Sequence, residues 1–150
     1  MFDKHLIKLI KGLTAFASIF AASTAMSHHD LANRDLTRGE ENYQLQCASC
    51  HGVNLEGQPN WRDFKEDGSL PAPPHDETGH TWHHTDYHLF MLTKYGIEEF
   101  LNMDYPNNMP AYNNLLTNDQ IIAVLSYIKS QWPSHIRIKH AQLNKVFKEN

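Results

Sequence analysis

The sequence predicts an all-α fold, with three main helices joined by loops and a short extra helix at the C-terminal end. Three observations favour it. Apolar residues recur at intervals of three and four behind helix-capping residues, as amphipathic helices require. No segment alternates as a half-buried strand does, and no internal repeat is visible. Glycine and proline are concentrated between these helical segments. The 150 residues suit one domain.

The first 27 residues have the pattern of a secretory signal peptide. Three lysines precede an uncharged, mostly apolar run over residues 12–22, and small residues follow. Cleavage after Ala25 or Ser27 fits this pattern. The apolar run is shorter than the ~20 residues that a membrane-spanning helix needs. We therefore expect a secreted protein, with no stable membrane insertion unless the segment is retained.

The predicted mature domain spans residues 28–150, with a core over about 37–133 and a C-terminal extension over 134–150. Removing the first 27 residues leaves 10 basic and 16 acidic residues, a net charge of −6. This charge gives no electrostatic basis for binding nucleic acid. It favours a protein partner that presents a basic patch.

The first helix is predicted over residues 37–46. Thr37 and Glu40 have the spacing of a capping box. Gly39 and Tyr43 are four residues apart and share a face. A glycine inside a helix costs about 1 kcal/mol relative to alanine. We therefore expect another helix to approach closely at Gly39.

A long loop is predicted over residues 52–81, because glycines and prolines interrupt it throughout. A loop of this length is uncommon in a compact domain unless it serves a binding site. Its apolar side chains are the candidates for contacts with a ligand or the core: Leu55, Trp61, Phe64 and Leu70.

The second helix is predicted over residues 86–95, between Thr85 as N-cap and Gly96 as its stop. Leu89, Phe90 and Leu92 are expected to face inward. An irregular stretch marked by prolines follows it.

The third helix has the clearest signals. Thr117 and Gln120 form a capping box, and Pro133 ends the segment. Its apolar face is formed by Ile121, Val124, Leu125 and Ile128. The short extra helix is expected after residue 134, with several apolar side chains partly buried: Ile136, Ala141, Leu143, Val146 and Phe147.

The only two cysteines lie in the segment Cys47-Ala-Ser-Cys50-His51. This is the C-x-x-C-H pattern of c-type haem attachment, in which each thiol joins one vinyl group of the porphyrin. The adjacent imidazole then binds the iron. The sequence therefore predicts one covalent haem, attached at Cys47 and Cys50, with His51 as the proximal ligand. Such a cofactor would give the long loop a large apolar surface to pack on.

Three other interpretations of the cysteines are weaker. A disulfide here would close a very small loop and stabilise little. A thioredoxin-like redox pair belongs in a βαβ context, which the sequence lacks. A structural zinc site needs two further ligands at suitable spacing, and no other cysteine is present.

Met109 is the best candidate for the second axial ligand, because methionine is a common partner of histidine on electron-transferring haem. It lies far downstream of His51, in a proline-marked loop just before the third helix. Met103 is the nearest alternative. Met91 lies within a helical apolar pattern that favours a place in the core.

The segment 75–88 holds five histidines, and three of them are candidates for a second metal site for copper or zinc: His80, His84 and His88. No fixed ligand spacing emerges, so hydrogen bonding to haem propionates, the loop or solvent is the competing interpretation. A histidine of this segment in place of Met109 would make a bis-histidine haem. Trp61, Trp82 and Tyr112 are candidate haem contacts.

Several of these residues together resemble class I cytochrome c, specifically its small bacterial periplasmic monohaem members. The resemblance covers roughly residues 37–133. It rests on the haem motif, on the Met-Pro-Ala-aromatic segment at 109–112, and on two pairs of residues that cross between the first and last helices: Gly39 and Tyr43 with Val124 and Tyr127. The histidine-rich segment and the C-terminal tail depart from the smallest members.

The resemblance implies a cytochrome c fold wrapped around one haem, in a protein that is secreted across the inner membrane into the periplasm. It also implies an electron carrier that cycles between Fe(II) and Fe(III). Such a protein is not an enzyme by itself, although it can serve as a subunit of an oxidoreductase system. Its partners would be redox proteins, with donor and acceptor unknown. Two alternatives stay open: a metal-handling module built on the histidine-rich segment, and a haem enzyme subunit with an open iron site.

Overall fold

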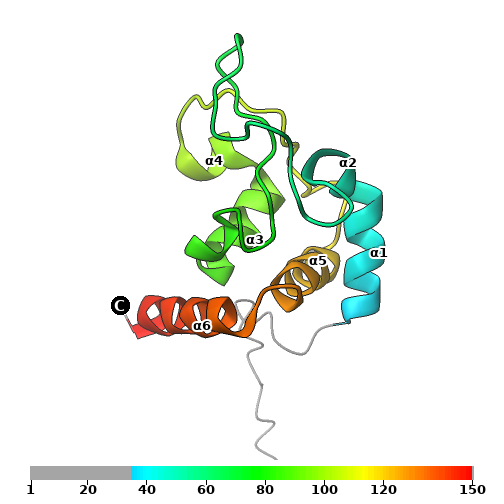
Figure 1. The fold of residues 1–150 in the computed structure, drawn as a ribbon, viewed down its shortest axis with the longest axis vertical. Coiled ribbons are helices and arrows are strands. Elements are labelled where there is room, and N and C mark those ends of the chain that lie inside the picture. Colours follow the sequence, from blue (N-terminus) through cyan, green and yellow to red (C-terminus); the bar gives the residue numbers. More distant parts are fainter. Residues whose placement is uncertain (1–34, 150) are drawn as a thin grey trace, which may run out of the picture.

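The computed structural model describes residues 35–149, which are helical or irregular and contain no strand (Figure 1). The predicted signal peptide at 1–27 lies outside the described residues. The helices are α1 (Leu36–Gln46), α2 (Ala48–His51), α3 (Asp86–Tyr95), α4 (Ile97–Leu101), α5 (Asn118–Ser130) and α6 (Ser134–Glu149), with a 3₁₀ turn, η1, at Thr81–His83. This arrangement confirms the predicted all-α class. Within the described residues, no helix is long and apolar enough to cross a membrane.

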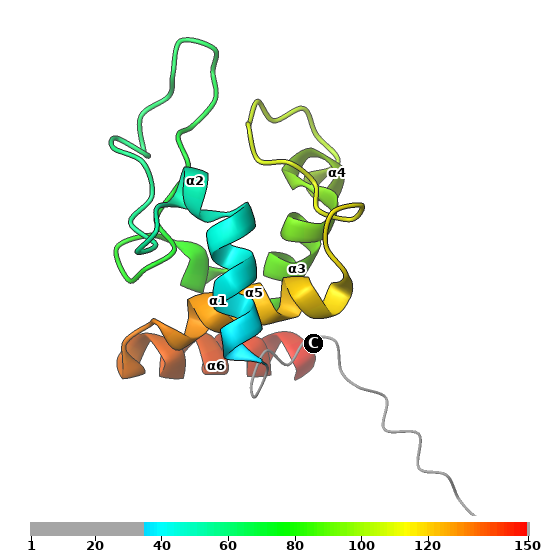
Figure 2. The same cartoon turned by 90° about the vertical axis from the view of Figure 1, so that its right-hand side faces the viewer.

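The most extensive helix contact in the described residues is that between α1 and α5, which cross in Figure 2. The crossing depends on Gly39, as expected. A Cβ atom at this position would overlap the carbonyl group of Ala123 and lie 2.9 Å from the Cβ of Tyr127. Tyr43 is fully buried beside Tyr127, with their ring centroids 5.6 Å apart. The glycine therefore allows the two backbones to approach and the aromatic rings to pack.

The start of α1 differs from the expected capping box. The helix begins at Leu36, and the Asp35 carboxylate accepts a hydrogen bond from the Arg38 N–H at 3.0 Å. Thr37 thus lies inside the first turn and is not the cap. An aspartate two residues earlier is an equally good capping residue, and the sequence spacing did not separate the two.

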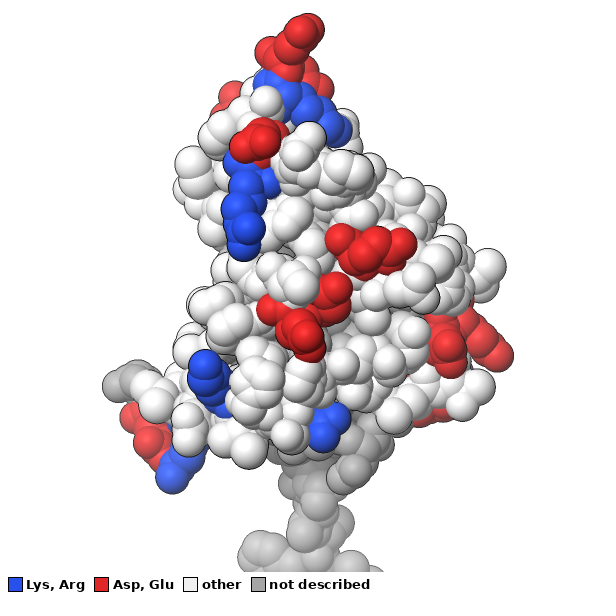
Figure 3. Space-filling model, viewed as in Figure 1, with Lys and Arg blue, Asp and Glu red and all other residues white. Residues whose placement is uncertain are grey.

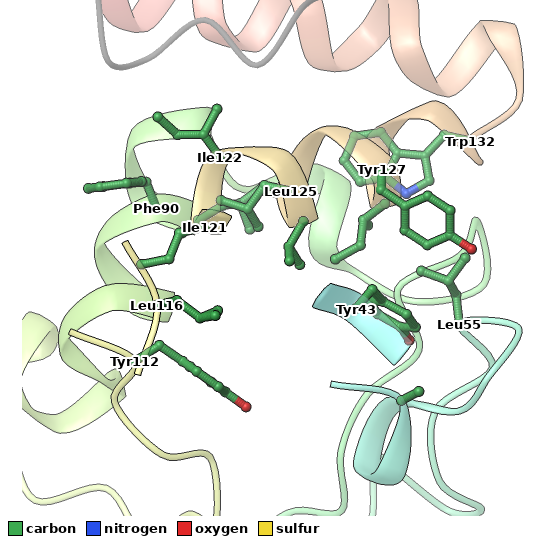
Figure 4. Packing of buried hydrophobic residues seen from close by; sticks show 14 of the residues in the cluster. Tyr43, Leu55, Phe90, Tyr112, Leu116, Ile121, Ile122, Leu125, Tyr127 and Trp132 are labelled. Carbon is green, nitrogen blue, oxygen red and sulfur yellow. The ribbon is translucent and has the colours of Figure 1, made fainter. Parts of the chain in front are cut away.

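The predicted capping box of α5 is confirmed. The Thr117 hydroxyl accepts from the Gln120 N–H at 3.3 Å, and the Gln120 side chain accepts from the Thr117 N–H at 2.9 Å. The residues of its predicted apolar face are all buried. Figure 4 shows Ile121 and Leu125 in the packed region between α5 and its neighbours.

Replacement of Thr117 by alanine should lower the free energy of unfolding by about 1 kcal/mol, because the first turn of α5 loses its cap. Thr37→Ala is the matched control. This variant should not lower the free energy of unfolding, and should raise it by a few tenths of a kcal/mol through helix propensity. Urea denaturation of both variants measures the difference. Equal losses would contradict the assignment of the caps.

The helix α3 has the predicted bounds, with Thr85 as N-cap and Gly96 ending it. The short α4 that follows was not expected, since five residues are too few to show a helical period. It ends at Asn102, whose positive φ of 51° is typical of a helix stop.

The helix α6 is longer and less buried than predicted. It has 16 residues and runs along the base of the molecule (Figure 1). Ile136 is buried as expected, but three of the predicted partly buried residues are exposed: Ala141, Val146 and Phe147. The second buried residue of α6 is His140, which apolar periodicity does not detect.

The long loop occupies residues 52–80, close to its predicted extent. In Figure 2 it stands opposite the segment that contains α4 and the chain up to α5. Leu55 is buried in the core, while Phe64 is 73% exposed and makes no core contact. The prediction of an inward Phe64 is therefore wrong, because the loop turns outward at that point.

Candidate functional site

A cavity of about 360 Å³ lies between the long loop and the chain that precedes α5. Its walls also include α3 and α5, so segments far apart in the sequence line it together. Most of the lining is apolar, and the apolar residues include Leu70, Leu89, Leu92, Ile97, Val124, Leu125 and Ile128. Tyr112 points into this region in Figure 4, on the far side from Tyr43. A cavity of this size and character suits a largely apolar ligand.

The two cysteines and His51 lie at one edge of the cavity. The chain leaves α1 at Cys47 and turns into α2, with the N–H groups of Cys50 and His51 both donating to the Cys47 carbonyl. All three side chains line the cavity. Cys47 and Cys50 are not joined to each other or to another cysteine. Burial raises the pKa of the Cys47 thiol to about 12, the opposite of what a reactive thiolate requires.

His51 is prepared to act as a ligand through its Nε2 atom. Its Nδ1 lies 2.8 Å from the Pro73 carbonyl, which accepts only, so Nδ1 carries the proton and Nε2 a lone pair. The side chain is buried, and this burial lowers the pKa, so the imidazole stays neutral near pH 7. A hydrogen bond from the second ring nitrogen to a carbonyl is the usual way to orient a ligating histidine.

His75 is a site residue that the sequence did not single out from its segment. Its ring is stacked on that of His51, with centroids 3.9 Å apart and planes at 20°. Its Nδ1 lies 2.8 Å from the Thr81 hydroxyl. Burial lowers its pKa well below the ordinary value, so it packs as a neutral ring. The Pro73 carbonyl was missed as well, since a backbone acceptor leaves no signal in residue type.

Met109 reaches the same cavity from the opposite segment. Among the methionines of the described residues, Met91 and Met103 do not line it, and Met103 is 54% exposed. The segment is held in place by Tyr112, whose N–H donates to Thr93 at 3.1 Å and whose hydroxyl donates to the Gln46 carbonyl at 2.8 Å. The structure therefore places Met109 and Tyr112 beside the end of α1 and along the same cavity.

The three histidines proposed for a second metal are not gathered at one point. His80 and His84 line the cavity, with ring centroids 5.4 Å apart. His88 packs instead against Phe100 and Phe147. The described residues contain no group of three histidine, cysteine, aspartate or glutamate side chains placed to hold a metal ion.

The two tryptophans among the candidate contacts have different positions. Trp61 lines the cavity and stacks on His80 at 5.4 Å, with the Arg62 guanidinium 4.2 Å from its ring centroid. Trp82 does not line the cavity. Its ring stacks on His83, and its N–H donates to the Glu77 carbonyl at 3.3 Å.

These groups fit a c-type haem. Two thiols, a neutral imidazole with a free Nε2 and a thioether all line one cavity whose walls are mainly apolar. His80, His84 and Lys65 also line the cavity. The Lys65 ammonium and the two imidazole rings are groups that suit the two propionate carboxylates of a haem. The donor set is that of the histidine–methionine ligated haem proteins.

Comparison with known proteins agrees with this geometry. A family model described as Cytochrome c matches residues 36–132, which include both cysteines, His51 and Met109 and leave α6 outside. Searches among curated proteins and among solved structures found no match. The family binds haem c covalently, and its members generally transfer electrons. The chain belongs to the cytochrome c family.

Proposed function

We propose that this protein is a periplasmic electron carrier whose haem is attached through Cys47 and Cys50 and ligated by His51 and Met109. One observation carries the proposal. Of the described methionines, Met109 alone lines the cavity that also receives the buried, neutral His51.

When bound, haem supplies a one-electron Fe(III)/Fe(II) couple. The residues of the chain tune that couple. The Pro73 carbonyl fixes the orientation of His51 and makes its Nε2 more basic. As a ligand, the Met109 thioether would favour Fe(II) and raise the potential of the haem. The apolar walls act in the same direction, because they disfavour the more highly charged oxidised form.

A bis-histidine haem is the second candidate, since His80 and His84 also line the cavity. His75 is a poor candidate for that role. Its ring lies parallel against His51, on the same side of the site, and its Nδ1 is engaged with Thr81. A haem enzyme of the open-site class needs a free sixth position on its iron. Met109, His80 and His84 all line the cavity as candidate sixth ligands, which argues against that class.

The redox partners would be proteins that dock briefly through a small interface. The face shown in Figure 3 carries acidic side chains at several separate places, with lysine and arginine side chains between them. With a net charge of −6 expected for the mature chain, a basic patch on the partner would speed the encounter. Entry into the periplasm would depend on the segment 1–27.

Optical spectra of the haem-loaded protein and of Met109→Leu test the proposal, with Met103→Leu as the matched control. The parent and the control should show the weak long-wavelength charge-transfer band of methionine bound to Fe(III). Met109→Leu should lose the band, and its potential should fall. A low-spin parent without the band would favour a histidine ligand. A high-spin parent that binds carbon monoxide and cyanide readily would move the protein to the open-site class.

A further inference from the structure

The helix α6 lies outside the matched family region and packs against the histidine-rich segment of the cavity wall. We propose that α6 is a brace that fixes residues 75–84 against the haem cavity, with His140 as its central positioning residue. The inference rests on the proposed function, because the wall it concerns belongs to that site.

His140 is fully buried at 0% exposure, and each of its ring nitrogens has a partner. Its Nε2 donates to the His84 carbonyl at 2.9 Å. Its Nδ1 lies 3.3 Å from the Asn144 side-chain amide, which donates to it. One neutral tautomer, with the proton on Nε2, makes both hydrogen bonds. His140 therefore links the two segments as a neutral ring and not as a charged group.

The other end of the wall segment is held by Trp132, just before α6. Its indole N–H donates to the His75 carbonyl at 2.8 Å, and its ring meets that of His140 edge-on at 5.0 Å. The two carbonyl groups at the ends of residues 75–84 are thus bonded to two side chains that touch each other. Trp132 is 2% exposed, so water does not compete well for its bond.

A third contact ties the brace to the start of α3. The side-chain amide oxygen of Asn144 accepts a hydrogen bond from the Asp86 backbone N–H at 2.8 Å. The Asp86 carboxylate meets Lys129 of α5 at 3.2 Å and His140 at 3.5 Å. One turn of α6 therefore binds residues 84 and 86, and Asp86 in turn pairs with Lys129 of α5.

The braced segment carries side chains that form the site. His75 supports His51, and His80, Thr81 and His84 line the cavity. Backbone hydrogen bonds that leave this segment are few: His75 and Asp76 donate to Leu55, and the bonds of His83 and His84 stay within the segment. Its position accordingly depends on side chains from elsewhere. A loosened wall would admit water, raise the local dielectric and favour the oxidised state, which lowers the potential.

The test uses the haem-loaded full chain in four forms: parent, His140→Leu, His140→Gln and His135→Leu. His135 is an exposed histidine of the same helix and serves as the matched control. Amide hydrogen exchange of residues 75–84 and the midpoint potential are measured at pH 7. His140→Leu should speed exchange in this segment about tenfold and lower the potential, since the His84 carbonyl loses its donor. The glutamine side chain can place an N–H near the same carbonyl, so His140→Gln should recover part of both changes.

Trp132→Phe keeps an aromatic ring but removes the N–H donor together with part of the indole volume, and it provides a second variant should His140→Leu fail to fold. It should also speed exchange near His75. If the melting temperature falls while exchange in residues 75–84 and the potential match the control, α6 merely adds stability and the inference is wrong. The result is separable from the proposed function, because the charge-transfer band of the parent reports Met109 ligation whatever the exchange data show.

Discussion

Replacing Gly39 with valine should destabilise the protein by about 3 kcal/mol, because no space exists for a side chain where α1 crosses α5. A Cβ atom there would overlap the Ala123 carbonyl group, which belongs to the backbone of α5 and cannot rotate away. The helices would have to separate. That separation would also disturb the packing of Tyr43 on Tyr127.

Denaturant unfolding of the haem-loaded protein measures this loss. Glu40→Val is the control, because it places the same β-branched residue at an exposed neighbouring position of α1. The control should lose only a few tenths of a kcal/mol through helix propensity. Similar losses in the two variants would contradict the inference that the close approach of α1 and α5 requires glycine at position 39.

Replacing Lys129 with methionine should cost about 3 kcal/mol, since it removes one partner of a buried ion pair. The Lys129 ammonium lies 3.2 Å from both carboxylate oxygens of Asp86, and the two side chains are 19% and 3% exposed. Without the ammonium, the nearly inaccessible carboxylate would retain His140, at 3.5 Å, as its partner. Lys145→Met is the control. It removes an exposed pair with Glu149 at 3.9 Å and should change stability little.

The size of this loss should depend on pH in a defined direction. Burial lowers the pKa of His140 below its ordinary value near 6.5, and the Lys129 ammonium lowers it further. The Asp86 carboxylate offsets only part of this effect. The unfolded chain therefore binds a proton more readily than the folded one, and this contribution to stability is present above about pH 6.5 and lost as the pH falls below it. In Lys129→Met the repulsion from the ammonium is absent, so the pKa of His140 rises.

The difference in unfolding free energy between the parent and Lys129→Met should accordingly shrink from pH 8 to pH 5. Parallel pH profiles of the two proteins, measured by urea unfolding, would contradict the coupling of His140 to this pair. Lys145→Met should follow the parent profile throughout.

How far the sequence predicts the site can be argued from individual residues. The haem motif at 47–51 and the candidate ligand Met109 were identified from spacing and local context. The side chains of Cys47, Cys50, His51 and Met109 all line one cavity. The partners of His51 did not follow. A proline carbonyl 22 residues away and a stacked His75 are brought to it only by the path of the long loop. Trp82 was also a candidate haem contact, but its ring stacks on His83 and lies outside the cavity.

By itself, the sequence determined the helices whose signals are local. The bounds of α3 and the capping box of α5 depend on hydrogen bonds between residues within four positions of one another. Short sequence patterns are therefore enough to predict them. The tertiary structure decided what joins segments far apart. His140 and Asn144 bond to residues 56 and 58 positions earlier, and neither apolar periodicity nor a motif marks such a contact. A buried polar link stabilises only through a partner that folding brings to it, so the role of α6 became visible only in the folded chain.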